Sequence, residues 1–375
     1  MTFSENVLKN EEKAMMNLRS LYRQYGYTQY KMSKFEEYDL YVRNKTFLKS
    51  DQIITFNDLN GRLMALKPDV TLSIVKNTKD CGDNLCKYYY NENVYRLSNT
   101  NREFKERMQA GLECLGKIDI YSMSEVILLA EKSLETIGEK YVLDISHMGF
   151  LSGFLDDLGV NEVQRPPILR GISEKNAPEI EKLCDQFKLK SEACLKLKKL
   201  TTLYGTFDEA IIVLKDVSTG SRTDEAVREL EAVCETVRSM GGGDHIYLDF
   251  SIVNDMNYYN GIIFQGFVDG VPTSILFGGR YDNLMLRFGR SSGAIGFAVY
   301  LDLLERYEEE KRPYDVDVLL LYDEKTQAKT LAKAVKALME KNKTVRVQQK
   351  DAVGVKYRQL MTIKNGRLEE IETDD

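Results

Sequence analysis

Apolar and polar residues follow one another along residues 246–304 in a pattern that predicts a sheet closed by a helix. Three runs, at 246–253, 261–268 and 273–279, are rich in β-branched and aromatic residues and are bounded by asparagine, aspartate and glycine, which predicts three strands. The run at 294–307 has apolar residues at helical spacing and predicts a helix. Glycines inside strand patterns indicate a close approach of backbone or ligand, so this stretch is a candidate binding floor.

The pattern ahead of this stretch predicts further helices and a hairpin. Residues 5–25 carry apolar side chains at helical spacing and stop at a glycine, which predicts a helix. Residues 27–42 follow as a strand and a short helix. The runs 51–58 and 61–68 meet at an Asp-Leu-Asn-Gly sequence, which predicts a hairpin. A helix then starts after Asp69, whose carboxylate is suited to capping it.

A second hairpin is predicted over residues 87–96, with the polar residues Asn91–Asn93 at its tip. Residues 98–107 have the composition of a polar loop, and residues 108–116 resume strand alternation. A Ser-x-x-Glu sequence at Ser122 then predicts the start of a capped helix.

Helical patterns dominate residues 164–243, from a proline pair at Pro166 to three consecutive glycines, and predict a helical insertion. Residues 313–375 predict a strand–helix–strand unit with a polar tail and a disordered acidic end. The insertion divides a core into two parts, at 1–163 and 244–312. The predicted fold class is therefore α+β, one mixed domain of helices and antiparallel strands with a helical insertion and a small C-terminal α/β unit.

The composition is that of an ordinary globular protein and argues against several classes of function. Of 375 residues, 43% are apolar and 29% charged, and the net charge of −6 argues against a nucleic-acid surface. The apolar runs are too short to span a membrane and no signal-peptide pattern is present, so we expect a cytoplasmic protein with reduced thiols. Its six cysteines form no CxxC pair and it has two histidines, so we expect no metal and no cofactor.

A scattered set of polar residues remains as candidate chemistry, because no P-loop sequence and no nucleophile beside a histidine is present. Gln109 and Glu113 lie four residues apart, so both point to one face if their segment is a strand. Acidic groups with tyrosines suit an ammonium or imidazole group, because carboxylates accept charge-assisted hydrogen bonds. A surface salt-bridge network explains the same residues equally well. The set comprises Asp69, Thr71, Arg96, Gln109, Glu113, Tyr258, Tyr259 and Arg280.

Six segments, in order, resemble the class II histidyl-tRNA synthetase family. Residues 25–42 are similar to its first motif, residues 93–116 to its second and residues 294–304 to its third. Residues 55–71 resemble the segment that grips the amino group of histidine. NDMNYYNGIIF is similar to the family's histidine-specific segment, and GGRYDNL to the strand pair after it. The resemblance spans residues 10–310 and implies an antiparallel sheet flanked by helices.

The resemblance also implies a pocket for histidine. Asp69 stands where the synthetases have a glutamate, in a Lys-Pro-Asp-x-Thr sequence. The positions that match histidine-contacting residues are Asp69, Thr71, Gln109, Glu113, Tyr258 and Tyr259.

The chain departs from the family where ATP is handled. The synthetases have an arginine at the positions of Asn254 and Leu303, a glycine at Tyr300, a glutamate at Ser98 and a proline at Ser33. Arginines that hold phosphates contribute roughly 10³-fold or more to such transfer reactions. Neither asparagine nor leucine supplies a bidentate cation. We therefore expect no aminoacylation.

A chain that keeps the histidine pocket but lacks the ATP-binding arginines resembles one branch of the family. This branch is the regulatory subunits of short-form ATP phosphoribosyltransferase. That branch implies a non-catalytic subunit required for the first step of histidine biosynthesis and for feedback inhibition by histidine. It implies a core dimer, a hetero-octamer with the short catalytic subunit, and no membrane partner. Residues 313–370 resemble a shortened anticodon-binding domain, which the branch commonly lacks. Two alternatives stay open: a divergent, active histidyl-tRNA synthetase, and a synthetase-like amino acid sensor.

Overall fold

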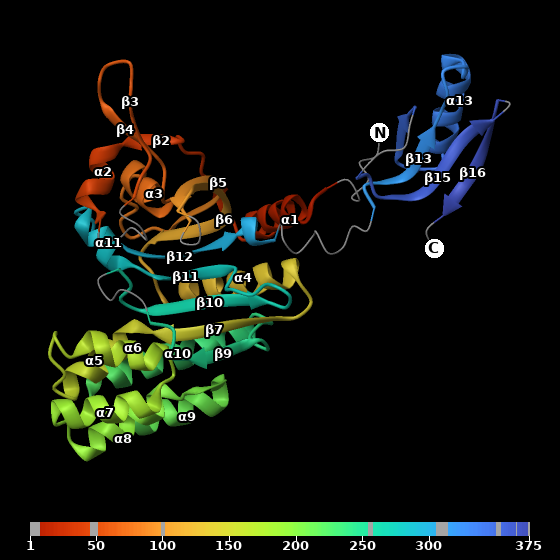
Figure 1. The fold of residues 1–375 in the computed structure, drawn as a ribbon. Helices are drawn as coiled ribbons and strands as arrows, with labels where there is room; N and C mark the ends of the chain where they lie inside the picture. Colours follow the sequence, from red (N-terminus) through yellow and green to blue (C-terminus); the bar gives the residue numbers. More distant parts are fainter. Residues whose placement is uncertain are drawn as a thin grey trace. The chain divides into compact units, whose positions relative to one another are not determined.

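The structure is a computed structural model, and it divides into two compact units, Met1–Glu305 and Arg306–Asp375 (Figure 1). Each unit has its own sheet and its own apolar core, and each is described by itself. The residues that the structure describes are 8–45, 52–98, 102–253, 258–304, 314–349, 354–364 and 366–373.

A nine-stranded sheet forms the centre of the larger unit. Its strands lie in the order β1, β5, β6, β12, β11, β10, β7, β9, β8. Neighbours are antiparallel except β1 with β5 and β7 with β9, which are parallel. The predicted α+β class with a largely antiparallel sheet is confirmed. The strands are β1 (Thr28–Gln29), β5 (Cys86–Leu97), β6 (Phe104–Gly116), β7 (Tyr141–His147), β8 (Tyr204–Thr206), β9 (Ile246–Asp249), β10 (Ile262–Val268), β11 (Leu276–Arg280) and β12 (Gly293–Tyr300).

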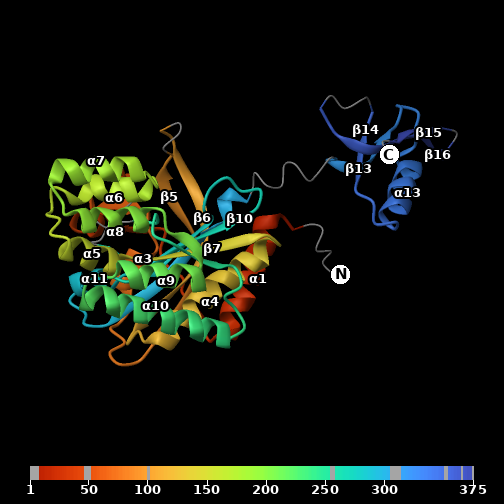
Figure 2. The same ribbon diagram turned by 90° about the horizontal axis from the view of Figure 1, so that it is seen from below.

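Long helices cover one face of this sheet, where α1 (Asn10–Gln24), α4 (Ile120–Ile137) and α10 (Ser221–Ser239) follow one another (Figure 2). Their apolar side chains pack with those of β6 and β12 in one core, because alternate residues of each strand point to this face. The predicted cap of α4 at Ser122 is wrong. Asp119 is the N-cap: its carboxylate accepts from the backbone N–H of Ser122 at 2.8 Å.

The opposite face of β5, β6 and β12 is covered by a smaller layer. This layer is the predicted hairpin, which forms the antiparallel pair β3 and β4, together with β2, α2 and α3. Apolar residues of α3 pack there against Tyr90, Leu115 and Ala294 of the large sheet. The elements are β2 (Phe35–Glu37), α2 (Tyr38–Arg43), β3 (Thr55–Asn57), β4 (Leu63–Leu66), α3 (Thr71–Asn77) and, after β11, α11 (Asp282–Arg287).

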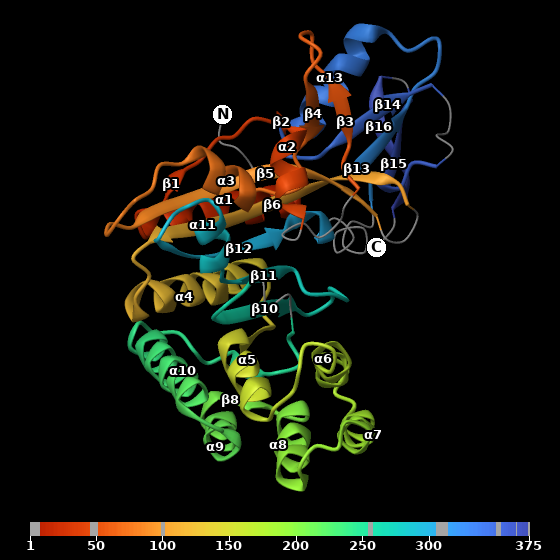
Figure 3. The same cartoon turned by 90° about the vertical axis from the view of Figure 1, so that its left-hand side faces the viewer.

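Helices gather at the β7–β9–β8 end of the sheet (Figure 3). α10, the last of them, contacts both α4 and α5 and so lies against the core. None of the helices in the described parts of the chain has the length and apolarity to cross a bilayer. The others are α5 (Met148–Asp157), α6 (Arg165–Ser173), α7 (Ala177–Phe187), α8 (Ser191–Thr201) and α9 (Phe207–Val217).

Two predicted elements of the large unit are wrong. The predicted helix at 294–307 is the strand β12, followed by a short 3₁₀ turn, η3 (Leu301–Leu303). β12 lies between β6 and β11 and is covered on both faces, so its apolar run is continuous and resembles a buried helix. The predicted hairpin at 87–96 is a single strand, β5, and Asn91–Asn93 pair with β6 instead of forming a tip.

The smaller unit consists of β13 (Val316–Leu321), α13 (Ala328–Met339), β14 (Val345–Gln348), β15 (Tyr357–Lys364) and β16 (Arg367–Thr373), with strand order β14, β13, β15, β16. The predicted polar tail with its disordered end is therefore wrong up to Thr373, because β15 and β16 form an antiparallel pair there. Val318, Leu320, Leu338 and Ile363 form a separate apolar core.

Separate cores predict separate unfolding transitions. Leu112→Ala in the core of the larger unit should lower the free energy of unfolding of that unit by about 2–5 kcal/mol and leave the smaller unit unchanged. Leu320→Ala should do the reverse. Urea denaturation followed by hydrogen exchange of peptides from each unit measures both, and either substitution moving both transitions equally would contradict the division.

Candidate functional site

A row of glycines makes room for a cluster of buried polar side chains on the face of the large sheet that α3 covers, and this cluster is the candidate pocket. Glu113 on β6 lies opposite Gly296 on β12, which lies opposite Gly279 on β11. A Cβ atom at Gly296 would lie 1.9 Å from Oε2 of Glu113, and one at Gly279 would lie 2.8 Å from the ring of Tyr259. Glycine at these two positions therefore makes room for the carboxyl group and the ring.

The Glu113 carboxyl group is buried and held by two hydroxyl groups. Thr71, at the start of α3, donates to Oε1 at 2.7 Å, and the hydroxyl of Tyr281 donates to Oε2. Burial raises the pKa of Glu113 to about 8, although the two hydroxyl donors act in the opposite direction, and the carboxylate of Asp69 raises it further. Near neutral pH the group is therefore mostly protonated, and a bound cation would favour its ionised form.

Asp69 is both a helix cap and an ion-pair partner. Its Oδ1 accepts from the backbone N–H of Leu72 at 2.9 Å, so the capping role open to it in the sequence is real. Its Oδ2 lies 3.4 Å from Nη2 of Arg96, and Nε of Arg96 donates to the carbonyl oxygen of Pro68 at 2.6 Å. Arg96 thus holds the turn that leads into α3.

Aromatic rings pack around Glu113 in the candidate pocket. The rings of Tyr258 and Tyr259 pack edge-to-face with centroids 4.4 Å apart, and Tyr258 lies 5.8 Å from the ring of Tyr281. Burial raises the pKa of all three phenols well above 10, so they stay protonated and offer O–H groups.

Gln109 shares the face of Glu113 because β6 is a strand throughout, as predicted. It is 2% exposed, and its Nε2 has no hydrogen-bond partner among the residues that the structure describes. A buried amide donor without a partner is costly, so it is a natural contact for a ligand oxygen.

Arg280 is not brought to this pocket. It pairs in register with Ile295, which pairs with Cys114, and these positions face α4 and α10. Its Nε donates to Asp282 at 2.8 Å, and its Nη1 lies 3.6 Å from Glu229 on α10.

The same Glu229 carboxylate lies 3.1 Å from Nε2 of His147, whose Nδ1 accepts from the backbone N–H of Phe150. His147 therefore carries its hydrogen on Nε2, and this N–H donates a hydrogen bond to Glu229. Glu229 is desolvated, yet its hydrogen bond to His147 and the nearby charges lower its pKa overall. Glu229, His147 and Arg280 thus connect α10 to the sheet.

Sequence reasoning passed over Tyr281. The Gly-Gly-Arg-Tyr run contains its signal: side chains alternate along a strand, so Tyr281 takes the face of Gly279 and Arg280 takes the other. The prediction chose Arg280 for its charge, whereas the adjacent Tyr281 is the residue that contacts Glu113.

The positions where the chain departs from the synthetase pattern have varied surroundings in the structure. Leu303 packs against the main apolar core, and Tyr300 ends β12 in register with Gln109. Ser98 is buried after β5, and Ser33 accepts from the backbone N–H of Phe35. Asn254 lies outside the described residues.

The thiol prediction is wrong for one pair of cysteines. Cys81 and Cys86 form a disulfide, while Cys114, Cys184, Cys194 and Cys234 are free. The two bonded residues are separated by a turn that returns the chain on itself, which no cysteine-spacing rule for metal or redox motifs covers.

Together, the large antiparallel sheet and the acidic, tyrosine-lined pocket define a class II synthetase-like protein. Residues 3–304 match the family described as histidyl-tRNA synthetase. Two relatives are described as ATP phosphoribosyltransferase regulatory subunits. The one from Clostridium kluyveri is 30% identical over 335 residues, 86% of this chain and 85% of the relative. The one from Ruminiclostridium cellulolyticum is 29% identical over 335 residues, 87% of this chain and 79% of the relative.

The chain therefore belongs to the histidyl-tRNA synthetase family, in the branch of the ATP phosphoribosyltransferase regulatory subunits. Solved structures share the fold. An ATP phosphoribosyltransferase regulatory subunit/histidyl-tRNA synthetase from Bacillus halodurans has a TM-score of 0.73 at 22% identity, covering 96% of this chain and 99% of that one. A chain of an ATP phosphoribosyl transferase complex from Thermotoga maritima has a TM-score of 0.61 at 18% identity, covering 78% and 97%.

The raised pKa of Glu113 predicts a pH-dependent stability. The folded protein keeps this proton up to about pH 8, whereas the unfolded chain loses it near pH 4.5. The free energy of unfolding should therefore fall as the pH rises through this window. Glu113→Gln cannot titrate, so its stability relative to the parent should improve by roughly 4–5 kcal/mol from pH 4.5 to 8.

Urea denaturation at a series of pH values measures this difference. Glu106→Gln on the same strand is the control, because Glu106 is exposed and its substitution should give no such trend. A constant difference between Glu113→Gln and the parent would contradict the burial argument.

Proposed function

We propose that this chain is the non-catalytic regulatory subunit of a short-form ATP phosphoribosyltransferase, in the cytoplasm. In this role it binds the short catalytic subunit, is required for its activity, and transmits inhibition by histidine. The observation that carries the proposal is an acidic pocket kept in a chain whose relatives, over most of their length, are described as such subunits.

The pocket suits histidine because it offers partners of the right chemistry. Glu113 can receive the ammonium or imidazole group, the Gln109 amide can donate to the carboxylate, and tyrosine rings can enclose the side chain. Asp69 adds negative charge at the rim, close enough to raise the pKa of Glu113. Histidine binding would then exchange the Glu113 proton for a ligand cation.

Adenylate formation is not part of the proposed function. Leu303 is part of the apolar packing where the synthetases have an arginine for ATP, and Tyr300 replaces a glycine beside the pocket. Arg96 remains, but it is engaged with Asp69 and the carbonyl oxygen of Pro68. We therefore expect the chain to bind histidine without forming the adenylate.

The proposed assembly is a hetero-octamer in which this chain also pairs with a second copy of itself through the core. Light scattering of a mixture with a short-form catalytic subunit measures the mass. A mass of this chain alone, with the catalytic subunit eluting separately, would contradict the proposed partnership.

Addition of this chain should raise the rate of phosphoribosyl-ATP formation by a short-form catalytic subunit by about 5–150-fold, the usual range of allosteric coupling, and histidine should reverse the effect. Glu113→Gln should still activate but should need about tenfold or more histidine for the same inhibition, because it loses a charged hydrogen-bond partner.

Glu106→Gln is the matched control and should keep the parent's response to histidine. If this chain left the catalytic subunit's rate unchanged, the regulatory role would be excluded. If it activated but Glu113→Gln responded to histidine as the parent does, the inhibitor would bind elsewhere.

A further inference from the structure

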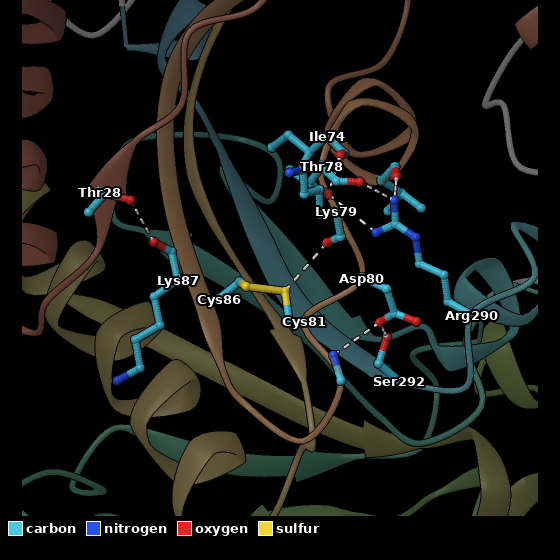
Figure 4. The surroundings of a disulfide bond; sticks show 12 residues. Thr28, Ile74, Thr78, Lys79, Asp80, Cys81, Cys86, Lys87, Arg290 and Ser292 are labelled. Carbon is cyan, nitrogen blue, oxygen red and sulfur yellow. Dashed lines mark hydrogen bonds between the residues drawn. A yellow bond between two sulfur atoms is a disulfide. The ribbon is translucent and has the colours of Figure 1, made fainter.

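A disulfide closes the loop that joins α3 to β5. The bond joins Cys81 to Cys86 (Figure 4). Both cysteines are half-buried, and the residues between them, Gly82–Leu85, are exposed. The bond therefore lies where a small thiol or a redox protein can reach its sulfur atoms.

The loop is attached to the sheet by groups other than the disulfide. The guanidinium of Arg290 donates to the carbonyl oxygens of Val75 and Thr78, and Ser292 donates to Oδ1 of Asp80 at 3.0 Å (Figure 4). These contacts fix residues 75–80 from the segment that leads into β12. They do not reach residues 81–86. That segment is restrained by the disulfide and by two hydrogen bonds within the turn, from the backbone N–H of Gly82 to Oδ1 of Asp80 and from that of Asn84 to the carbonyl oxygen of Cys81.

The Cys81 thiol of the reduced state would have a hydrogen-bond acceptor nearby. Sγ of Cys81 lies 3.7 Å from the carbonyl oxygen of Lys79. A disulfide sulfur has no proton to donate, whereas a Cys81 thiol would donate to this oxygen. Both redox states can therefore be accommodated with the same backbone around residues 79–81.

The other cysteines are poorly suited to redox chemistry. Cys114, Cys184 and Cys234 are buried, and burial raises the pKa of each thiol to about 12. The thiolate is the reactive form, so these three thiols are inert at neutral pH. Cys194 is half-buried and forms no disulfide, and its thiol contacts the high-pKa thiol of Cys184.

We propose that Cys81 and Cys86 are a reversible oxidation site that controls the mobility of the α3–β5 loop. A dithiol reductant opens it in two steps. One reductant thiolate attacks a sulfur of the pair, forms a mixed disulfide and releases the other cysteine as a thiol. The second reductant thiolate then attacks the reductant sulfur of the mixed disulfide and releases the remaining cysteine as a thiol. Two electrons and two protons pass to the protein, and the reductant leaves as a disulfide. A low-molecular-weight disulfide reverses the reaction.

The consequence is local. A short covalent loop restricts the open conformations of the chain it encloses, so reduction should raise the exchange of backbone amides at 82–86 by roughly tenfold. Amides of α3 should change less, because Arg290 holds its last turn in both states.

The test starts with purification without reductant, acid quenching and alkylation under denaturing conditions, followed by mass spectrometry of the peptides. We expect the peptide with Cys81 and Cys86 to be unalkylated, to become alkylated at both after dithiothreitol, and to reoxidise with oxidised glutathione. Hydrogen exchange of both states follows the loop. Cys81→Ser should reproduce the reduced state without reductant, and Cys194→Ser should leave both states unchanged.

Two results would overturn the proposal. One is alkylation of both cysteines even after treatment with oxidised glutathione. The other is equal amide exchange at 82–86 in the oxidised and reduced parent protein, a comparison that needs no variant to fold.

Discussion

The Glu113 carboxyl group is the interaction on which the pocket depends. A buried carboxyl group is tolerated only if its oxygens have partners, and here the partners are Thr71 and Tyr281. They come from the start of α3 and from the end of β11, so the sheet and its covering layer must both be in place. Gly296 leaves the space that the carboxyl group fills. One acidic group thus connects the packing of the covering layer to the chemistry of the pocket.

Binding an amino acid and activating it need different groups, and the chain separates them. An acidic pocket lined by tyrosines can hold a cationic ligand without any phosphate-binding arginine. Activation also needs cations that stabilise the charge moving on ATP. In the described part of the chain, Leu303 contributes to the apolar core and Arg96 is paired with Asp69. This division supports the proposed regulatory role, in which a bound ligand is reported to a partner subunit.

The alternation of side chains along predicted strands was the most informative pattern for the candidate site. It placed Gln109 and Glu113 on one face, and the order of motifs predicted the central sheet. The failures have physical reasons. β12 is buried on both faces, so its apolar run lacks the two-residue period that distinguishes a strand. Arg280 and Tyr281 face opposite sides, and only the register with β12 decides which side holds the pocket. The Cys81–Cys86 bond depends on a turn whose path local composition does not determine.

The proposed pocket binds histidine without activating it. The most direct measurement is histidine-dependent ATP–pyrophosphate exchange by the purified chain, with histidine binding followed by calorimetry on the same preparation. We expect binding that Glu113→Gln weakens, and exchange at the level of a blank without protein. Exchange above that blank that is lost in Glu113→Gln would contradict it and would identify an active synthetase.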